Sequence, residues 1–288
     1  MRVQDGVDGG LALVTGASSG LGEALAFEFA RNQHPLILTG RSHERLNAVA
    51  ARIAAEFGHR PAIIVADLAA SGAGRALADE IHCRGLAPKY IVNSAGVGLF
   101  GRAERLAIED QLAVLNLNCG ALTEVTLSLL PDIVRQRGGI LNVGSVGGYF
   151  PGPGMAVYFA TKAYVLSLSQ GLRAEYAQGR VHVTALCPGP VSTRFQARAR
   201  MVAPRIPVLL DHRIDRIAQA GYRGLMRNRA VVTPGFFNAL IVAVGRLYQR
   251  ACTPLVRAFH FGWPRRRNAV RTPDLGTQTV ARSNITGP

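Results

Sequence analysis

The stretch "LALVTGASSGLGEALAFEFAR", residues 11–31, decides the fold expected for this chain. Residues 11–15 form a short apolar run that is typical of a buried strand, and residues 21–31 follow a helical period. Glycines at positions 16, 20 and 22 lie at the junction, where they allow the backbone to turn tightly. The stretch therefore predicts a strand, a glycine-rich turn and a helix in immediate succession.

The same rhythm continues along most of the chain. Five further strands are predicted by "PLILTG", "PAIIVADL", "YIVNSAG", "GGILNVGS" and "VHVTALCPG", and "RAVVTPG" at 229–235 predicts a seventh. Helices are expected at 42–57, 71–84, 108–136 and 154–178. Strands that alternate with helices predict an α/β fold with a doubly wound parallel sheet, the Rossmann fold, covered by helices on both faces.

Two regions depart from this rhythm. Residues 193–229 are rich in arginine and lack a clean period, so we expect a mobile flap over a site. We predict one domain over 1–235, an apolar and basic helical extension over 236–263, and a polar, disordered tail over 264–288. The longest apolar run in the extension is about half of the roughly 20 residues needed to cross a bilayer. Its arginines, and "PRRR" at 264–267, would suit peripheral membrane contact through 236–267, or cover for the pocket or a neighbouring subunit.

Composition limits the classes of function. The formal net charge of +15 is compatible with nucleic acid, an anionic membrane or acidic ligands, but it is carried by arginine in a chain with only two lysines, Lys89 and Lys162. Only the net charge suggests a nucleic-acid partner, so we expect none. The four cysteines lack the spacing of a metal site or disulfide framework, so no metal is expected. The first ten residues have two acids and no apolar run, which favours a cytoplasmic protein.

The glycine-rich turn is typical of a site for the pyrophosphate of a dinucleotide. A helix that begins there directs its first amides, and the positive end of its dipole, at an anion. The residues expected to bind are Gly16, Ser18, Ser19, Gly20, Leu21 and Gly22. After the second strand the chain has Arg41 and Ser42, and no acid that would hold the ribose hydroxyls of NAD(H). The sequence therefore favours NADP(H).

Taken in order, these motifs closely resemble the short-chain dehydrogenase/reductase family, over about residues 9–235. The resemblance rests on "TGASSGLG", "DL" at 67–68, "NSAG" at 93–96, Asn116 in "VLNLN", Ser145 in "NVGS", "YFATK" at 158–162 and "PGPVST" at 188–193. Some similar sequences are ketoacyl reductase-like. The resemblance implies an NADPH-dependent oxidoreductase that moves hydride between nicotinamide and a carbonyl or alcohol.

The resemblance also assigns the catalytic roles. Tyr158 would be the general acid/base, Ser145 would hydrogen-bond the substrate oxygen, and Asn116 would anchor a water chain to Lys162. Lys162 lies one helical turn beyond Tyr158, so we expect its charge to lower the pKa of the phenol. In the family this lysine also holds the nicotinamide ribose.

Further contacts are implied in the same way. The cofactor contacts implied beyond the glycine-rich turn are Asp67 and Leu68 beside the adenine, Asn93, Ala95 and Gly96 on the adenosine side, and Pro188, Gly189, Val191 and Thr193 towards the carboxamide. Tyr149, Phe150 and Met155 would line, with Ser145, an apolar pocket for a hydrophobic substrate, or would equally pack the core. A homodimer or homotetramer is expected through 108–136 and 154–178. The alternative function is an NADP(H)-binding regulator without turnover.

Overall fold

The computed structural model describes residues 9–178, 181–191 and 213–247. In these residues seven strands form one sheet, in the order β3-β2-β1-β4-β5-β6-β7, and every neighbouring pair is parallel. The strands are β1 (Ala12–Thr15), β2 (Leu36–Gly40), β3 (Ala62–Val65), β4 (Tyr90–Asn93), β5 (Gly139–Val143), β6 (His182–Leu186) and β7 (Val231–Val232). The prediction of a doubly wound parallel sheet is confirmed.

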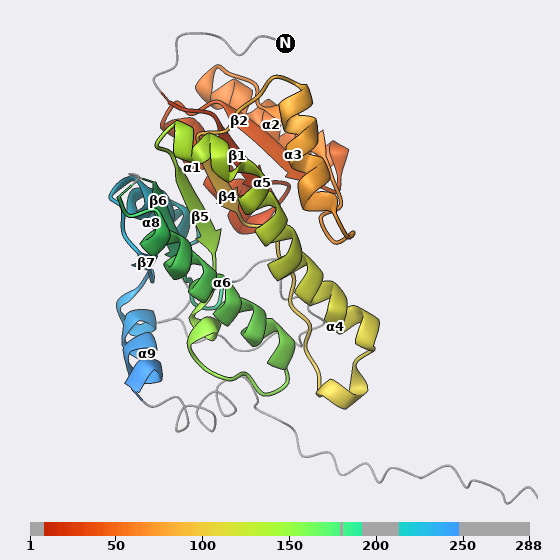
Figure 1. The fold of residues 1–288 in the computed structure, drawn as a ribbon, viewed down its shortest axis with the longest axis vertical. Coiled ribbons are helices and arrows are strands. Elements are labelled where there is room, and N and C mark those ends of the chain that lie inside the picture. Colours follow the sequence, from red (N-terminus) through yellow and green to blue (C-terminus); the bar gives the residue numbers. More distant parts are fainter. Residues whose placement is uncertain (1–8, 179–180, 192–212, 248–288) are drawn as a thin grey trace, which may run out of the picture.

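Helices cover both faces of the sheet (Figure 1). On one face lie α1 (Gly20–Arg31), α2 (His43–Phe57) and α8 (Ile214–Met226). On the other lie α3 (Ala73–Cys83), α5 (Leu122–Arg135) and α6 (Ala156–Glu175), with α4 (Ile108–Leu115) leading into α5. Short 3-10 turns, η1 (Ala103–Arg105) and η3 (Val146–Tyr149), lie in the loops that follow β4 and β5.

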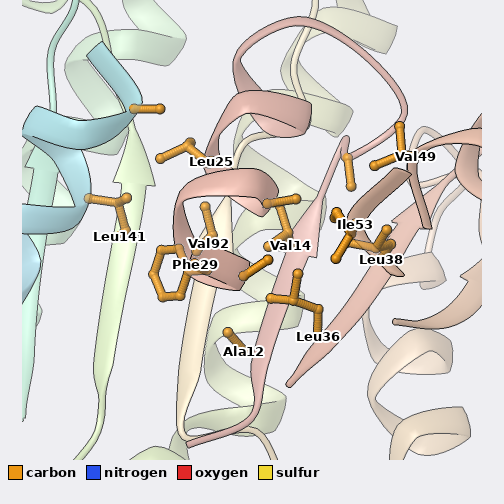
Figure 2. Close-up of a cluster of buried hydrophobic side chains, with 14 of the residues drawn as sticks. Ala12, Val14, Leu25, Phe29, Leu36, Leu38, Val49, Ile53, Val92 and Leu141 are labelled. Carbon is orange, nitrogen blue, oxygen red and sulfur yellow. The ribbon is translucent and has the colours of Figure 1, made fainter. Parts of the chain in front are cut away.

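The core follows from the alternation of side chains along the strands. Val14 of β1 points to the α1 face and Leu13 to the α3 and α5 face, and both are fully buried. Figure 2 shows the buried cluster on the α1 face, in which Leu25 and Phe29 of α1 lie over the sheet. Apolar side chains are buried between the sheet and the helices on both of its faces. This packing holds the sheet in place, and the loops start from the ends of its strands.

The predicted flap over 193–229 is wrong for its last part, where α8 forms. Buried Ile217, Ala218 and Leu225 make its apolar stripe, and glycines occupy Gly221 and Gly224. A Cβ at Gly221 would come within 2.7 Å of Leu186 Cδ2, and one at Gly224 within 2.2 Å of Val232 Cγ2. The two glycines thus let α8 pack closely on β6 and β7. Because they are not apolar side chains, the hydrophobic pattern of the sequence does not show the helical period of the buried side. Residues 193–212 of the predicted flap lie outside the described residues.

The long helix predicted over 108–136 is present but interrupted. Between α4 and α5, residues Asn116–Ala121 form a π-helical segment, η2. By length and composition, Ile108–Arg135 is the one helix in the described chain that could cross a membrane, with a mean hydropathy of 1.3. Its buried side, with Leu129 and Ile133, packs against α3 and the sheet as a core helix does.

The predicted C-terminal extension begins with α9 (Phe236–Leu247), which packs on η3. Val242 of α9 is buried with Tyr149 and Leu166. The domain boundaries stay a prediction, because the extension beyond 247 and the whole predicted tail over 264–288 lie outside the described residues.

Candidate active site

The glycine-rich turn between β1 and α1 leaves no room for side chains. Gly16 and Gly20 have φ of +66° and +63°, where other residues are strained. A Cβ at Gly16 would lie 2.9 Å from Ala95 Cα, and one at Gly22 would lie 2.3 Å from the Gly16 oxygen. Ser19, which precedes α1, makes no side-chain cap, so the first amides of the helix remain available to an anion. The turn fits a pyrophosphate.

The end of β2 lies against this turn. A Cβ at Gly40 would be 3.3 Å from Ser18 Oγ, which places exposed Arg41 next to the glycine-rich turn. Ser42 has a second task, because its hydroxyl accepts a hydrogen bond from the Arg45 amide at 3.3 Å and caps α2. A cation beside the turn, with no acid next to it, suits an additional phosphate.

After β3, exposed Asp67 accepts a hydrogen bond from the Ala69 amide at 3.1 Å, and Leu68 is buried in the core. Leu21, at the first turn of α1, packs against the opposite core cluster. The segments expected to flank an adenosine are therefore held in place by contacts within the protein: a hydrogen bond at Asp67 and core packing at Leu68 and Leu21.

The loop after β4 is held by Thr15, whose hydroxyl accepts hydrogen bonds from the Ser94 and Ala95 amides, each at 3.0 Å. Asn93 is buried and donates to Thr126 Oγ1 at 2.8 Å and Asn142 Oδ1 at 2.9 Å. Its side-chain nitrogen thus joins β4 to β5 and α5, and supports the loop from within. The sequence argument missed this buried network, for which polar residues at core positions were the available signal.

Lys162 and Tyr158 lie on one side of α6. The Lys162 side chain is 7% exposed, its Nζ donates to the Val143 oxygen at 2.9 Å, and Nζ lies 5.7 Å from the centre of the Tyr158 ring. Burial lowers the pKa of Lys162 to about 8, while the nearby Cys187 and Cys119 raise it. The ammonium is therefore desolvated and held by a carbonyl at the end of β5.

Tyr158 differs from the prediction. We expected the lysine charge to lower the pKa of the phenol, but burial raises the pKa of Tyr158 to about 12, and only its hydrogen bond with Ser145 lowers it. Ser145 follows β5, and its hydroxyl also accepts from the Gly147 amide at 3.0 Å. The structure brings Ser145, Tyr158 and Lys162 together, with the phenol protonated at neutral pH.

Asn116 does not enter this site, which corrects the prediction that it would anchor a water chain to Lys162. Asn116 is exposed, whereas Asn118, two residues on in the π-helical segment, is buried. The Asn118 amide exchanges two hydrogen bonds of 2.9 Å with the Val97 backbone and donates to Thr161 Oγ1 at 3.0 Å. A Cβ at Gly96 would lie 3.2 Å from Asn118 Oδ1 and 3.7 Å from Lys162 Nζ, so Asn118 is the asparagine at the lysine.

The predicted pocket residues belong to two apolar clusters, one of which contacts Tyr158. Met155 is buried with Phe159, and the partly buried Phe100, Phe150 and Tyr158 pack against them. Tyr149 is 5% exposed and packs under α9, so it belongs to the core and does not line an open pocket. Phe100, in the stretch "GVGLFG" at 96–101 that follows β4, packs in the same cluster as Tyr158.

The loop after β6 approaches the same edge. The Pro188 oxygen accepts a hydrogen bond from the Val146 amide at 3.0 Å, and Val191 packs on the core. A Cβ at Gly189 would lie 2.4 Å from Asn238 Oδ1 of α9. Thr193 lies outside the described residues.

A family model described as short chain dehydrogenase matches residues 10–202. The chain belongs to this family. It is therefore an NAD(P)-dependent oxidoreductase of the short-chain type, as the sequence predicted, and the converging serine, tyrosine and lysine lie where the family motifs were recognised.

Curated relatives are enzymes. The chain is 35% identical to serine 3-dehydrogenase of Agrobacterium fabrum over 65% of this chain and 74% of the relative. It is 36% identical to the NADP-dependent 3-hydroxy acid dehydrogenase of Salmonella typhi over 65% of this chain and 75% of the relative. It is 33% identical to the very-long-chain 3-oxoacyl-CoA reductase of Anas platyrhynchos over 65% and 61%.

Two solved structures are similar over 84% of this chain. One is a short-chain dehydrogenase from Sphingobium yanoikuyae in complex with NADPH, with 32% identity, 96% of its chain covered and a TM-score of 0.72. The other is the bulky-bulky ketone-specific alcohol dehydrogenase from Comamonas testosteroni, with 29% identity, 94% covered and a TM-score of 0.69.

Replacing Asn118 tests the corrected assignment. In Asn118→Ala the Val97 amide and oxygen lose their buried partners, which costs about 1–3 kcal/mol of unfolding free energy. We expect kcat to fall at least about tenfold, because the loop beside Lys162 is released. Asn116→Ala is the matched control and should stay within about 0.5 kcal/mol of the wild type with unchanged turnover. The assignment fails if the two variants exchange these behaviours in urea unfolding and steady-state kinetics.

Proposed function

We propose that the protein is an NADP(H)-dependent oxidoreductase for a carbonyl or alcohol on a hydrophobic substrate, with Tyr158 as the general acid/base. The observation that carries the proposal is the hydrogen bond between Ser145 and Tyr158 beside the buried Lys162 ammonium. A packing tyrosine needs neither a serine at its hydroxyl nor an ammonium under its ring. The three residues meet at the carboxyl ends of parallel strands, which is the place where open α/β sheets bind ligands.

The protonation states suit carbonyl reduction. Because burial raises the pKa of Tyr158 to about 12, the phenol carries its proton at neutral pH and donates it to the carbonyl oxygen. Ser145 donates a hydrogen bond to that oxygen and stabilises its developing negative charge. NADPH, when bound, would supply the hydride. The hydrogen bond with Ser145, which lowers the pKa of Tyr158, then stabilises the tyrosinate until a proton returns from solvent.

The cofactor preference rests on Arg41. It is exposed beside the glycine-rich turn, and the loop holds no acid that would repel a 2′-phosphate. A relative is named as NADP-dependent, and a similar solved structure is a complex with NADPH. Lys162 would hold the nicotinamide ribose, and the amides of Ser19 and Gly20 would hold the pyrophosphate.

The substrate class rests on the apolar cluster at the phenol. Met155, Phe159, Phe100 and Phe150 gather around Tyr158, so the reacting oxygen would enter beside an apolar wall. Relatives named for very-long-chain 3-oxoacyl-CoA and for bulky ketones support a hydrophobic body next to the carbonyl.

We also propose that the protein forms a dimer through α4, α5 and α6. A groove of about 470 Å³ on this face is lined by residues that include Leu115, Leu127 and Tyr164, which are 46%, 50% and 40% exposed. Tyr164 and Thr123 are joined across the face by a hydrogen bond of 2.7 Å, so the surface is preformed. Burial of these apolar groups against their copies would favour association.

Tyr158→Phe separates enzyme from regulator. Loss of the hydroxyl should lower kcat with apolar ketones by roughly 10²–10⁴-fold. NADPH affinity, followed by nicotinamide fluorescence, should change little, and Tyr176→Phe, on the same chain segment after α6, should behave as wild type. Undiminished ketone reduction by Tyr158→Phe would remove the tyrosine from the mechanism. A wild type that binds NADPH but turns over no ketone or alcohol would favour the regulator.

Arg41→Ala tests the cofactor preference. Loss of one charged contact to the 2′-phosphate should lower kcat/KM for NADPH about 10–100-fold and leave the value for NADH nearly unchanged. The control is Arg60→Ala, in which an exposed arginine bound to Asn47 is removed from the far end of β3. Equal losses with both cofactors would count against the assignment.

Leu115→Glu/Leu127→Glu tests the dimer. Charges in the groove should convert the protein to a monomer in sedimentation velocity experiments, because they would be desolvated in the interface. Phe236→Glu on α9 should leave the dimer intact. A wild-type monomer, or a double variant that remains a dimer, would refute this interface.

A further inference from the structure

The outer face of α9 exposes a continuous apolar surface. Phe236, Phe237, Leu240 and Val244 are 77%, 43%, 50% and 40% exposed. Spacings of four residues place Phe236, Leu240 and Val244 on one side of the helix. In Figure 1, α9 lies at the edge of the molecule, beyond β7 and outside the helical layers that cover the sheet. Exposed aromatic groups gathered in this way mark an interaction surface.

The inner face of α9 fixes the helix to the body of the protein. Val242 is buried in the cluster that contains Tyr149 and Leu166. Asn238 is fully buried, donates to the Pro234 oxygen at 2.8 Å and lies against Gly189. The apolar outer face is therefore presented by an anchored helix, and its exposure does not come from a loose end.

The charge of the surrounding sequence indicates an anionic partner. Residues 236–288 hold eight arginines and one aspartate, a net charge of +7 out of +15 for the whole chain. Arg246 lies near the end of α9, and the sequence alternates apolar residues with arginines there and at Arg250 and Arg257. In α8 and the turn after it, Arg216, Arg223, Arg227 and Arg229 are exposed as well. An apolar face within a basic segment matches an anionic lipid surface.

We propose that the outer face of α9 docks on an anionic lipid surface, with the helix lying in the plane of the headgroups. The 12-residue helix is about 18 Å long, too short to cross a hydrocarbon layer of about 30 Å. A second copy of the same segment would bring one strongly positive charge against another, which opposes pairing through this face. The docked helix would hold η3 and the Gly189 loop, both of which it contacts, close to the lipid.

The test uses the full chain in vesicle flotation. Wild type should bind vesicles of phosphatidylcholine mixed with phosphatidylglycerol at low salt, bind pure phosphatidylcholine weakly, and release in high salt. Phe236→Ser/Phe237→Ser should weaken partitioning about tenfold or more, because it removes most of the insertable apolar area. Ile108→Ser is the control, since Ile108 is 68% exposed at the start of α4 and its loss should leave partitioning unchanged.

Two results would overturn the proposal. The first is a wild type that does not bind the anionic vesicles at low salt, and the second is an α9 variant that binds as well as wild type. If that variant also loses self-association, the face is assigned to a second copy. All replaced side chains are exposed, so circular dichroism should show that each variant is folded.

Discussion

The site depends on one constraint, the desolvated ammonium of Lys162. A charge with so little contact with water must be compensated by fixed dipoles, and here the Val143 carbonyl at the end of β5 provides one at 2.9 Å. The ring of Tyr158 and the amide of Asn118 lie around the same point. Burial lowers the pKa of Lys162 and raises that of Tyr158, so one desolvated environment disfavours both charged forms. A compact ammonium fits this space, whereas a guanidinium is larger and planar, which accounts for a buried lysine in a chain that has only one other lysine, Lys89, among its many arginines.

The parallel sheet makes this arrangement possible. Because its strands share one direction, the segments after β1, β4, β5 and β6 emerge at one edge. Gly16 permits the β1 turn to touch the β4 loop, and Thr15 ties the two together. The nucleotide turn and the proton-transfer groups are thus positioned by loops that leave the same sheet.

Much of this was predictable from the sequence, and the exceptions have physical causes. Strand runs, the glycine-rich turn and the helical pairing of Tyr158 with Lys162 follow from periods that the chain displays directly. Asn118 lies at the site in place of the predicted Asn116 because both residues belong to a π-helical segment. Such a segment changes the direction of side chains but does not alter the hydrophobic pattern of the sequence. The helix α8 was missed because its stripe is completed by Gly221 and Gly224. The direction of the shift in the Tyr158 pKa depends on burial, which adjacency in sequence does not reveal.

The central claim is that Lys162 is buried as a destabilised charge, and the pH dependence of its contribution to folding tests it most directly. Its pKa is about 8 in the folded protein and 10.5 as the ordinary value, so the folded state binds fewer protons between these values. The penalty is fully present below pH 8 and is relieved as pH rises towards 10.5. Urea unfolding of wild type and Lys162→Met at pH 7 and pH 10 should show wild type gaining about 1–2 kcal/mol relative to the variant. A difference between the two proteins that stays constant with pH, or a relative loss by wild type, would contradict the account.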